Sequence, residues 1–240
     1  MTRRRCRVFL AGEGPSDIGD LAHEPQYRGD GEGFIQPLLR KLVDDVEIEF
    51  DGAKIAFLPG KRAAGVIGHG EKARRALALA AASEATAVVF IKDVDRTAGV
   101  KQTERDARRR IDEMRKQIET GFAAAREKSP ELSNVVAVAA TPCRMIEAWA
   151  LADPEALRTV GANPAEAPEH PELLHGDERN PQSNHPKRVL ERAFGRAANR
   201  EDFAAIATEA DVTTLKRRCP LSFAPLAAEV RGAAQRCRTE

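Results

Sequence analysis

Acidic side chains stand at three points of the sequence where an apolar run ends. Glu13 lies between two glycines after the first of these runs, and Glu147 comes after the last. Asp93 and Asp95 follow the run Ala87–Ile91. Carboxylates brought together repel one another unless a cation lies among them, and oxygen ligands suit Mg²⁺ or Mn²⁺. The acids therefore predict a metal site, which could activate a nucleophile and stabilise the leaving oxygen of a phosphodiester.

The elements that must position these acids follow from the spacing of the apolar residues. Continuous apolar runs are typical of parallel strands covered on both faces. The expected strands are Arg5–Ala11, a two-part segment Val46–Phe50 and Lys54–Leu58, Ala87–Lys92 and Val135–Ala140. Helical spacing predicts helices within residues 34–42, 71–82 and 101–126. Strands that alternate with helices indicate an α/β fold, with a parallel Rossmann-like sheet and flanking helices.

The predicted strand ends place the acids at one edge of the sheet, where open parallel sheets bind ligands. Asp93 and Asp95 can face the same side, because extended residues two apart point the same way. Glu147 is expected one turn into the helix after the fourth strand. The glycines around Glu13 are expected to let the main chain pass close to a ligand that the glutamate faces; the resemblance described below implies that this ligand is a nucleic-acid backbone. Ser16 or Asp17 has an ordinary interpretation, as the cap of a short helix.

The second part of the chain lacks strand signals. Repeated prolines divide residues 154–186 into loops and turns. Helical patterns then cover Lys187–Phe194, Asp202–Glu209 and Phe223–Arg236. We therefore expect two parts, an α/β core over residues 1–153 and an α-helical C-terminal extension, residues 154–240, packed on the core.

The composition is that of a soluble globular chain, with 42% apolar and 31% charged residues among 240. No apolar run approaches the ~20 residues of a membrane span, and no signal-like segment is visible. The four cysteines lie far apart, which argues against a disulfide framework and a zinc site. A cytoplasmic protein without a membrane partner is expected. The net charge of +1 neither favours nor excludes a nucleic-acid partner.

Several phrases of the sequence together resemble a known family. They are EGPSD, DVDRT, MIEAWALADP, HPKRVLERAF and RRCPLSFAPLAAEV. The chain resembles Toprim domains, the metal-dependent catalytic fold of topoisomerases, bacterial primases, small ribosomal-RNA maturases and OLD (overcoming lysogenization defect) nucleases. In those families a glutamate in an E-G pattern ends the first strand and Asp-x-Asp ends the third, matched here by Glu13 and by Asp93 and Asp95. The chain is similar in particular to a bacterial Toprim-like family of unknown function, often encoded beside ATPases and suspected of roles in defence against phage.

The resemblance implies a role for each matched residue. Asp93 and Asp95 would hold Mg²⁺ or Mn²⁺, and Glu13 would hold a second metal ion or act as general base or acid. Glu147 would complete the metal shell. Lys187 would stabilise charge on the scissile phosphate.

The activity implied by the resemblance is a metal-dependent nuclease acting on DNA or RNA, the effector of an anti-phage system with an ATPase partner. Lys61, Arg62 and Arg96 are expected to contact the nucleic acid, although a plain exposed loop also explains Lys61 and Arg62. Topoisomerase chemistry is not expected, because the single tyrosine, Tyr27, lies in a polar loop. The accessory modules of primases are also missing.

Two other interpretations stay open. FIKDVDRT also fits the first motif of haloacid-dehalogenase-like phosphohydrolases, with Asp93 as nucleophile, Asp95 as acid and base, and Thr97 in the loop. Thr141 and Lys187 would supply the second and third motifs of that family. No apolar strand ending in paired aspartates follows Lys187, however, and the glutamate between the glycines is left unused. The last interpretation is a non-catalytic Toprim-like subunit that regulates a partner ATPase.

Overall fold

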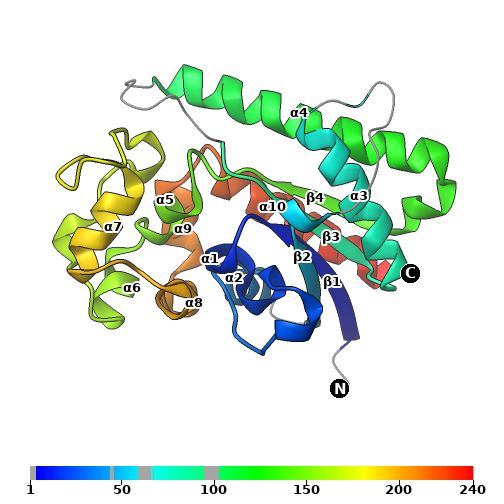
Figure 1. Cartoon of the computed structure of the whole chain (residues 1–240), viewed down its shortest axis with the longest axis horizontal. Helices are drawn as coiled ribbons and strands as arrows, with labels where there is room; N and C mark the ends of the chain where they lie inside the picture. The colour runs from blue at the N-terminus through cyan, green and yellow to red at the C-terminus, as the bar shows by residue number, and fades with distance from the viewer. Residues whose placement is uncertain (1–3, 44–45, 59–65, 67, 95–102, 240) are drawn as a thin grey trace.

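A computed structural model of the chain describes residues 4–43, 46–58, 66, 68–94 and 103–239 (Figure 1). Within these residues, parallel strands form one four-stranded sheet in the order β2-β1-β3-β4. The strands are β1 (Arg4–Gly12), β2 (Val46–Lys54), β3 (Ala87–Ile91) and β4 (Val136–Ala140). The helices are α1 (Pro15–Ile18), α2 (Ile35–Leu42), α3 (His69–Ala82), α4 (Glu104–Lys128), α5 (Ile146–Ala150), α6 (Pro154–Thr159), α7 (Pro186–Phe194), α8 (Arg200–Glu209), α9 (Val212–Arg218) and α10 (Phe223–Thr239). The predicted α/β fold, with a parallel sheet, flanking helices and a helical C-terminal region, is confirmed.

Helices cover both faces of the sheet, as the continuous apolar runs predict. Alternate residues of β1 point to opposite faces. Val8 and Leu10 belong to one hydrophobic cluster, and Phe9 and Ala11 belong to another. The cluster around Phe9 packs against α3 and α4, which lie above the sheet in Figure 1. Every residue of β3 is buried, because the strand lies between these two layers.

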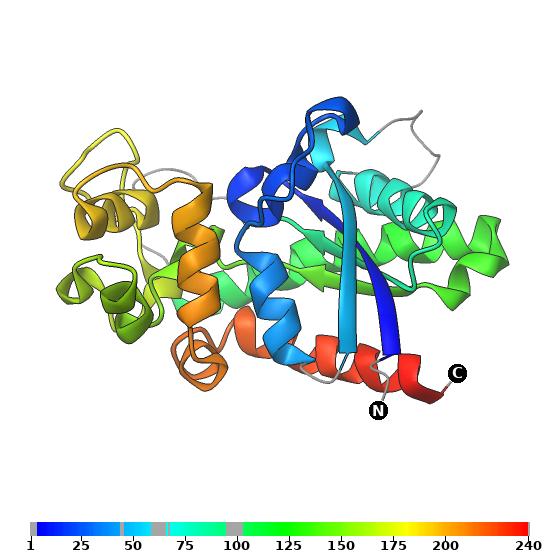
Figure 2. The same cartoon turned by 90° about the horizontal axis from the view of Figure 1, so that it is seen from below.

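The other face of the sheet packs against the C-terminal helices. Figure 2 shows α10 running below the strands and α8 standing beside α2, and both α10–β4 and α2–α8 are in contact. Trp149 is fully buried and lies edge-on to Phe223, with ring centroids 5.4 Å apart. One hydrophobic cluster therefore contains residues from both sides of residue 153, where the sequence predicts a boundary between two parts. The division into two parts stays a prediction.

The second strand differs from the sequence-based prediction. β2 is continuous from Val46 to Lys54, and the predicted second piece, Lys54–Leu58, is replaced by the 3₁₀ turn Ile55–Phe57. Ile55 and Leu58 are nevertheless buried in the cluster below α3. A turn therefore buries these apolar residues as well as a strand would, and the apolar pattern alone does not separate the two.

Two short helices, α6 and α9, lie outside the helical patterns identified in the sequence. α6 begins in the proline-rich part, because Asp153 caps it by accepting hydrogen bonds from the N–H groups of Glu155 and Ala156. α9 begins in the same way at Asp211, which accepts from the N–H of Thr214. In the part of the chain that the structure describes, no helix combines the length and the hydrophobicity that a membrane span requires.

Candidate active site at the carboxyl edge of the sheet

Glu13 and Asp93 lie side by side where β1 and β3 end. Ala11 pairs with Phe90 in the parallel register, so that two residues further on Glu13 is level with Lys92. The Glu13 carboxylate accepts hydrogen bonds from Lys92 Nζ at 2.8 and 2.9 Å. It also accepts from the backbone N–H of Asp93 at 3.1 Å. The structure thus brings two of the predicted acids to one edge of the sheet and pairs the first with a buried lysine.

Asp93 is held by backbone pairing that continues past the ends of β3 and β4. The N–H of Lys92 donates to the carbonyl of Ala140 at 2.9 Å, and the N–H of Val94 donates to that of Pro142 at 3.1 Å. The main chain therefore fixes Asp93 from both sides. Its Oδ1 atom is buried and has no hydrogen-bond partner among the described residues. Such an unsatisfied buried atom is rare in native structures and needs a reason.

Asp17 is a further acid at this edge and joins the site through α1. Its Oδ2 accepts hydrogen bonds from the N–H groups of Glu13 at 2.7 Å and Gly14 at 3.2 Å, so Asp17 fixes the backbone that carries the Glu13 carboxylate. The turn is tight, because a Cβ atom on Gly12 would lie 2.7 Å from Cγ2 of Ile18. Packing against α1 therefore requires a glycine at position 12, and the prediction that Gly12 and Gly14 let nucleic acid approach Glu13 stays a prediction. A Cβ on Gly14 would meet no atom of the described residues within 4 Å.

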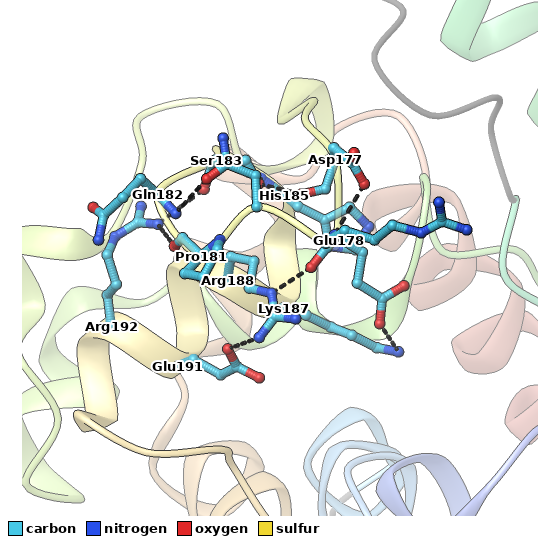
Figure 3. A network of polar contacts seen from close by, with 12 residues as sticks. Asp177, Glu178, Pro181, Gln182, Ser183, His185, Lys187, Arg188, Glu191 and Arg192 are labelled. Atoms are coloured by element: carbon cyan, nitrogen blue, oxygen red, sulfur yellow. Dashed lines mark hydrogen bonds and ion pairs between the residues drawn. The ribbon is translucent and has the colours of Figure 1, made fainter.

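Glu147 and Lys187 reach the site from two helices that pack together. Glu147 is buried in the first turn of α5, and α7, which carries Lys187, packs against α5. Lys187 Nζ donates to Glu178 Oε1 at 3.0 Å, as Figure 3 shows. Burial opposes the charge of Lys187, but the Glu178 bond and the charges of Glu147 and Asp93 outweigh it and raise the pKa of the lysine. The Lys187 ammonium therefore acts electrostatically on both of these acids.

The acids at this edge shift one another's pKa values. Burial raises the pKa of Asp93 well above its usual range, and three neighbouring carboxylates raise it further. They belong to Asp17, Glu147 and Glu13. Burial also raises the pKa of Asp17 to about 6 and that of Glu147 to about 7. Each of these four side chains acts electrostatically on at least one of the others, and we call them the acidic cluster. Clusters of perturbed acids in one place are typical of functional sites.

The donor atoms of this acidic cluster suit a hard divalent cation. Carboxylate oxygens are the ligands that Mg²⁺ and Mn²⁺ prefer, and a cation would relieve both the repulsion and the unsatisfied Oδ1 of Asp93. Among the residues that the structure describes, however, no three acidic, histidine or cysteine side chains are close enough to hold one ion. A complete ligand shell would need water or Asp95, which lies outside the described residues. Lys61, Arg62 and Arg96, the predicted nucleic-acid contacts, also lie outside them.

Lys92 and Asp17 are the residues of the site that the sequence-based prediction missed. A lysine after an apolar run is common at strand ends, and nothing in its spacing indicates that it pairs with Glu13. Asp17 was identifiable, because a residue four positions after Glu13 returns to the same side when the chain turns into a helix. Its ordinary interpretation as a helix cap concealed this.

The fold and the acidic cluster define an α/β protein with a candidate active site at the carboxyl ends of its parallel strands. The chain belongs to the family described as a domain of unknown function, DUF4276, whose model matches residues 29–231. The matched part contains Asp93, Glu147 and Lys187, and Glu13 and Asp17 precede it. No curated protein and no solved structure matches the chain. The resemblance to OLD-type Toprim nucleases therefore stays a prediction.

Proposed function

We propose that this chain is a divalent-metal-dependent nuclease that hydrolyses phosphodiester bonds in DNA or RNA. The observation that supports the proposal is the acidic cluster of Glu13, Asp17, Asp93 and Glu147 at one sheet edge, with Lys187 acting on it. Acids with raised pKa values beside a lysine are the arrangement needed to place positive charge and a proton acceptor around one phosphate.

Under this proposal the exposure of each acid determines its role in catalysis. Mg²⁺ or Mn²⁺, held by Asp93 together with Asp95 and Glu147, would supply positive charge at the scissile phosphate. Glu13 has a side chain that is 37% exposed, whereas Asp93 has a buried Oδ1 and Glu147 a buried side chain. Glu13 is therefore the acid that a water molecule or a second ion reaches most easily, and it would bind that ion or accept the proton of the attacking water.

The two lysines of the site have different tasks in this proposal. Lys92 is buried and bonded to both oxygens of Glu13, so it orients that carboxylate. The side chain of Lys187 is 44% exposed, so its ammonium is accessible to a substrate phosphate. An ammonium that meets charge developing on the phosphate stabilises the transition state more than the ground state.

The biological setting of the proposed activity rests on the family resemblance. We place the chain in the cytoplasm as the nuclease of an anti-phage system that acts with an ATPase partner. The free thiols of Cys6 and Cys219 are compatible with a reducing compartment.

The experiment that tests the proposal compares variants on labelled DNA and RNA, with Mg²⁺ or Mn²⁺ and with a chelator. We expect metal-dependent cleavage by the wild type and none by Asp93→Ala. Glu13→Gln, which keeps the shape and removes the charge, should lose a comparable share of activity. Glu131→Gln is the matched control, because Glu131 is exposed and precedes β4, at the opposite end of the strands from the acidic cluster. This variant should cleave nucleic acid at the wild-type rate.

The same variants decide against the haloacid-dehalogenase interpretation. That interpretation predicts hydrolysis of a small phosphomonoester, such as para-nitrophenyl phosphate, and tolerance of Glu13→Gln. Robust monoester hydrolysis by Glu13→Gln would overturn the nuclease proposal. Equal cleavage by the wild type and Asp93→Ala would overturn the assignment of the site.

A further inference from the structure

His185 is a buried histidine with an unused ring nitrogen. The residue is 5% exposed, and Nδ1 has no hydrogen-bond partner among the described residues. It lies directly before the first turn of α7, two positions before Lys187. An unsatisfied polar atom inside a protein destabilises the fold, so its presence at this position points to a ligand.

The charges around His185 are mainly positive. Burial lowers the pKa of this histidine to about 4, and the charges of Arg144, Lys187 and Arg188 act in the same direction. Glu178 is the carboxylate that opposes them. The imidazole is therefore neutral near neutral pH and can donate one hydrogen bond to an anion. The surrounding cations favour a negatively charged ligand there.

Arg144, one of these cations, has a strained backbone. Its φ angle is +73°, a left-handed conformation that residues other than glycine rarely adopt. Its buried guanidinium donates to the carbonyls of Leu174 at 2.9 Å and Gly176 at 2.8 Å. These bonds tie the segment that leads to α7 to the turn after β4. Strain of this kind persists where the surroundings require it, and it is common at ligand sites.

A carboxylate of the protein itself already engages Lys187. Glu178 Oε1 lies 3.0 Å from Lys187 Nζ, and the two side chains are 52% and 44% exposed. Arg188 donates from Nε to the backbone carbonyl of Glu178, which keeps this residue at the start of α7 (Figure 3). Exposed ion pairs of this kind are weak. A phosphate with more charge and more acceptor oxygens can therefore displace the Glu178 carboxylate.

We propose that Lys187, His185 and the first turn of α7 form an anion subsite for a phosphate of the nucleic-acid backbone, and that Glu178 is its internal occupant. α7 has nine residues, and the N–H groups of Lys187 and Arg188 in its first turn have no partner within the helix and attract anions, whereas Pro186 has no N–H and the His185 N–H donates to Ser183 Oγ. Arg144 adds positive charge beside the histidine. The nature of the ligand rests on the proposed function, because α7 packs against α5, which carries Glu147, and this packing places the subsite next to the acidic cluster.

The test measures phosphate binding without metal and without cleavage. Inorganic phosphate is titrated calorimetrically into the full chain in a chelator at constant ionic strength. His185→Phe keeps a ring of similar size but removes the nitrogens, and it should weaken binding about tenfold. Glu178→Gln should strengthen binding by a similar factor, because Lys187 loses its internal partner.

A matched control and a stability measurement exclude indirect effects. Glu166→Gln removes a carboxylate that pairs with Arg192 of the same helix, and it should leave phosphate binding unchanged. Phosphate should raise the melting temperature of the wild type more than that of His185→Phe. Without phosphate, His185→Phe should be at least as stable as the wild type, because it removes an unsatisfied buried nitrogen.

The outcomes separate this subsite from the proposed nuclease activity. Equal phosphate affinity in the wild type and His185→Phe, or no gain in Glu178→Gln, would overturn the subsite even if the chain cleaves nucleic acid. The Glu178 variant changes an exposed residue, so it gives a result even if the histidine variant fails to fold. The predicted affinity pattern in a chain that cleaves neither DNA nor RNA would support the subsite and contradict the nuclease.

Discussion

Two buried acids, Asp93 and Glu172, show what separates a reactive carboxylate from a structural one. Burial raises the pKa of both. Glu172 accepts hydrogen bonds from the N–H groups of Leu221 and Ser222, each at 2.8 Å, and from the Ser222 hydroxyl. Asp93 instead faces three other carboxylates, and its Oδ1 accepts no hydrogen bond from the described residues.

The surroundings of Glu172 form a complete polar network. The Ser222 hydroxyl oxygen also accepts from Trp149 Nε1 at 2.8 Å and from the N–H of Cys143 at 3.1 Å. This network ties the start of α10 to the turn after β4 and to α5. A fully satisfied buried network adds rigidity, whereas a partly satisfied one destabilises the fold. The buried Glu172 carboxylate is therefore fully hydrogen-bonded and stabilises the fold. The buried Asp93 carboxylate keeps an oxygen that a ligand can bind.

The largest expected effect is on cleavage by Asp93→Asn. The amide keeps the volume of the side chain but removes the charge, and the loss of one catalytic acid is expected to lower the rate by about 10²–10⁴-fold. The variant should be no less stable than the wild type, because it relieves repulsion among buried carboxylates. Single-turnover cleavage and thermal unfolding check both parts. Loss of folding together with activity would make Asp93 a structural acid like Glu172.

The second prediction is the reverse case, Glu172→Ala. Removal of this acceptor leaves buried N–H groups of Leu221 and Ser222 unpaired and should lower the free energy of unfolding by about 2–4 kcal/mol. The folded fraction should cleave at the wild-type rate. Denaturant unfolding measures the loss, and Glu169→Ala, an exposed neighbour, is the control with an expected change within about 0.5 kcal/mol. A stable Glu172→Ala with poor cleavage would contradict the comparison.

The third prediction concerns the pH dependence of stability in the metal-free protein. The pKa of Glu147 is raised from 4.5 to about 7 in the folded chain, so the folded state keeps a proton that the unfolded state releases. Its stabilising contribution is therefore complete below about pH 4.5 and is lost as the pH rises towards about 7. One pKa unit corresponds to about 1.4 kcal/mol, or roughly 3–5 °C in the melting temperature of a chain of this size.

Glu147→Gln checks this prediction, because its side chain stays neutral at every pH. The variant should melt higher than the wild type near pH 8 and lose the advantage towards pH 5. Melting curves of both proteins across this range, in a chelator, give the difference. Parallel curves would show that the Glu147 environment does not favour the neutral acid.

The smallest effect is expected for Asp17→Asn, which lies between the two cases. Asp17 accepts two backbone hydrogen bonds, as Glu172 does, but it also belongs to the acidic cluster. The asparagine oxygen can keep those bonds, so stability should change by no more than about 0.5 kcal/mol and cleavage should fall about tenfold. Asp17→Ala should lose both. Equal cleavage by the two variants would show that the charge of Asp17, rather than its bonds to the Glu13 loop, matters.

Much of the fold was predictable because its strands are continuous apolar runs. Every residue of β3 is buried, and such a run followed by an acid indicates both the strand and its functional end. The turn at Ile55–Phe57 was not predictable in the same way, because a short apolar run such as Ile55–Leu58 is compatible with either a strand or a buried turn. The caps of α6 and α9 act through single side chains, Asp153 and Asp211, inside proline-rich or polar sequence.

The candidate site was predictable only where residues follow strand ends or match a motif. Glu13 and Asp93 were identified in this way, because parallel strands bring their carboxyl ends together. The pairing of Lys92 with Glu13 depends on the register between β1 and β3, which the sequence does not show. The Glu172–Ser222 contact joins residues 50 positions apart, and only the packing of α10 brings them together.

The packing of α10 against β4 also means that the sheet cannot be fully covered until the end of the chain has been synthesised. One face of the sheet is covered in part by α10, whose residues leave the ribosome more than 80 positions after β4 is complete. At synthesis rates of about 5–20 residues per second, α10 emerges on the order of ten seconds after β4. During this time the hydrophobic cluster that contains Val8, Leu10 and Val138 lacks its α10 residues. Aggregation or chaperone binding on the ribosome should therefore be governed by how soon the last helix emerges.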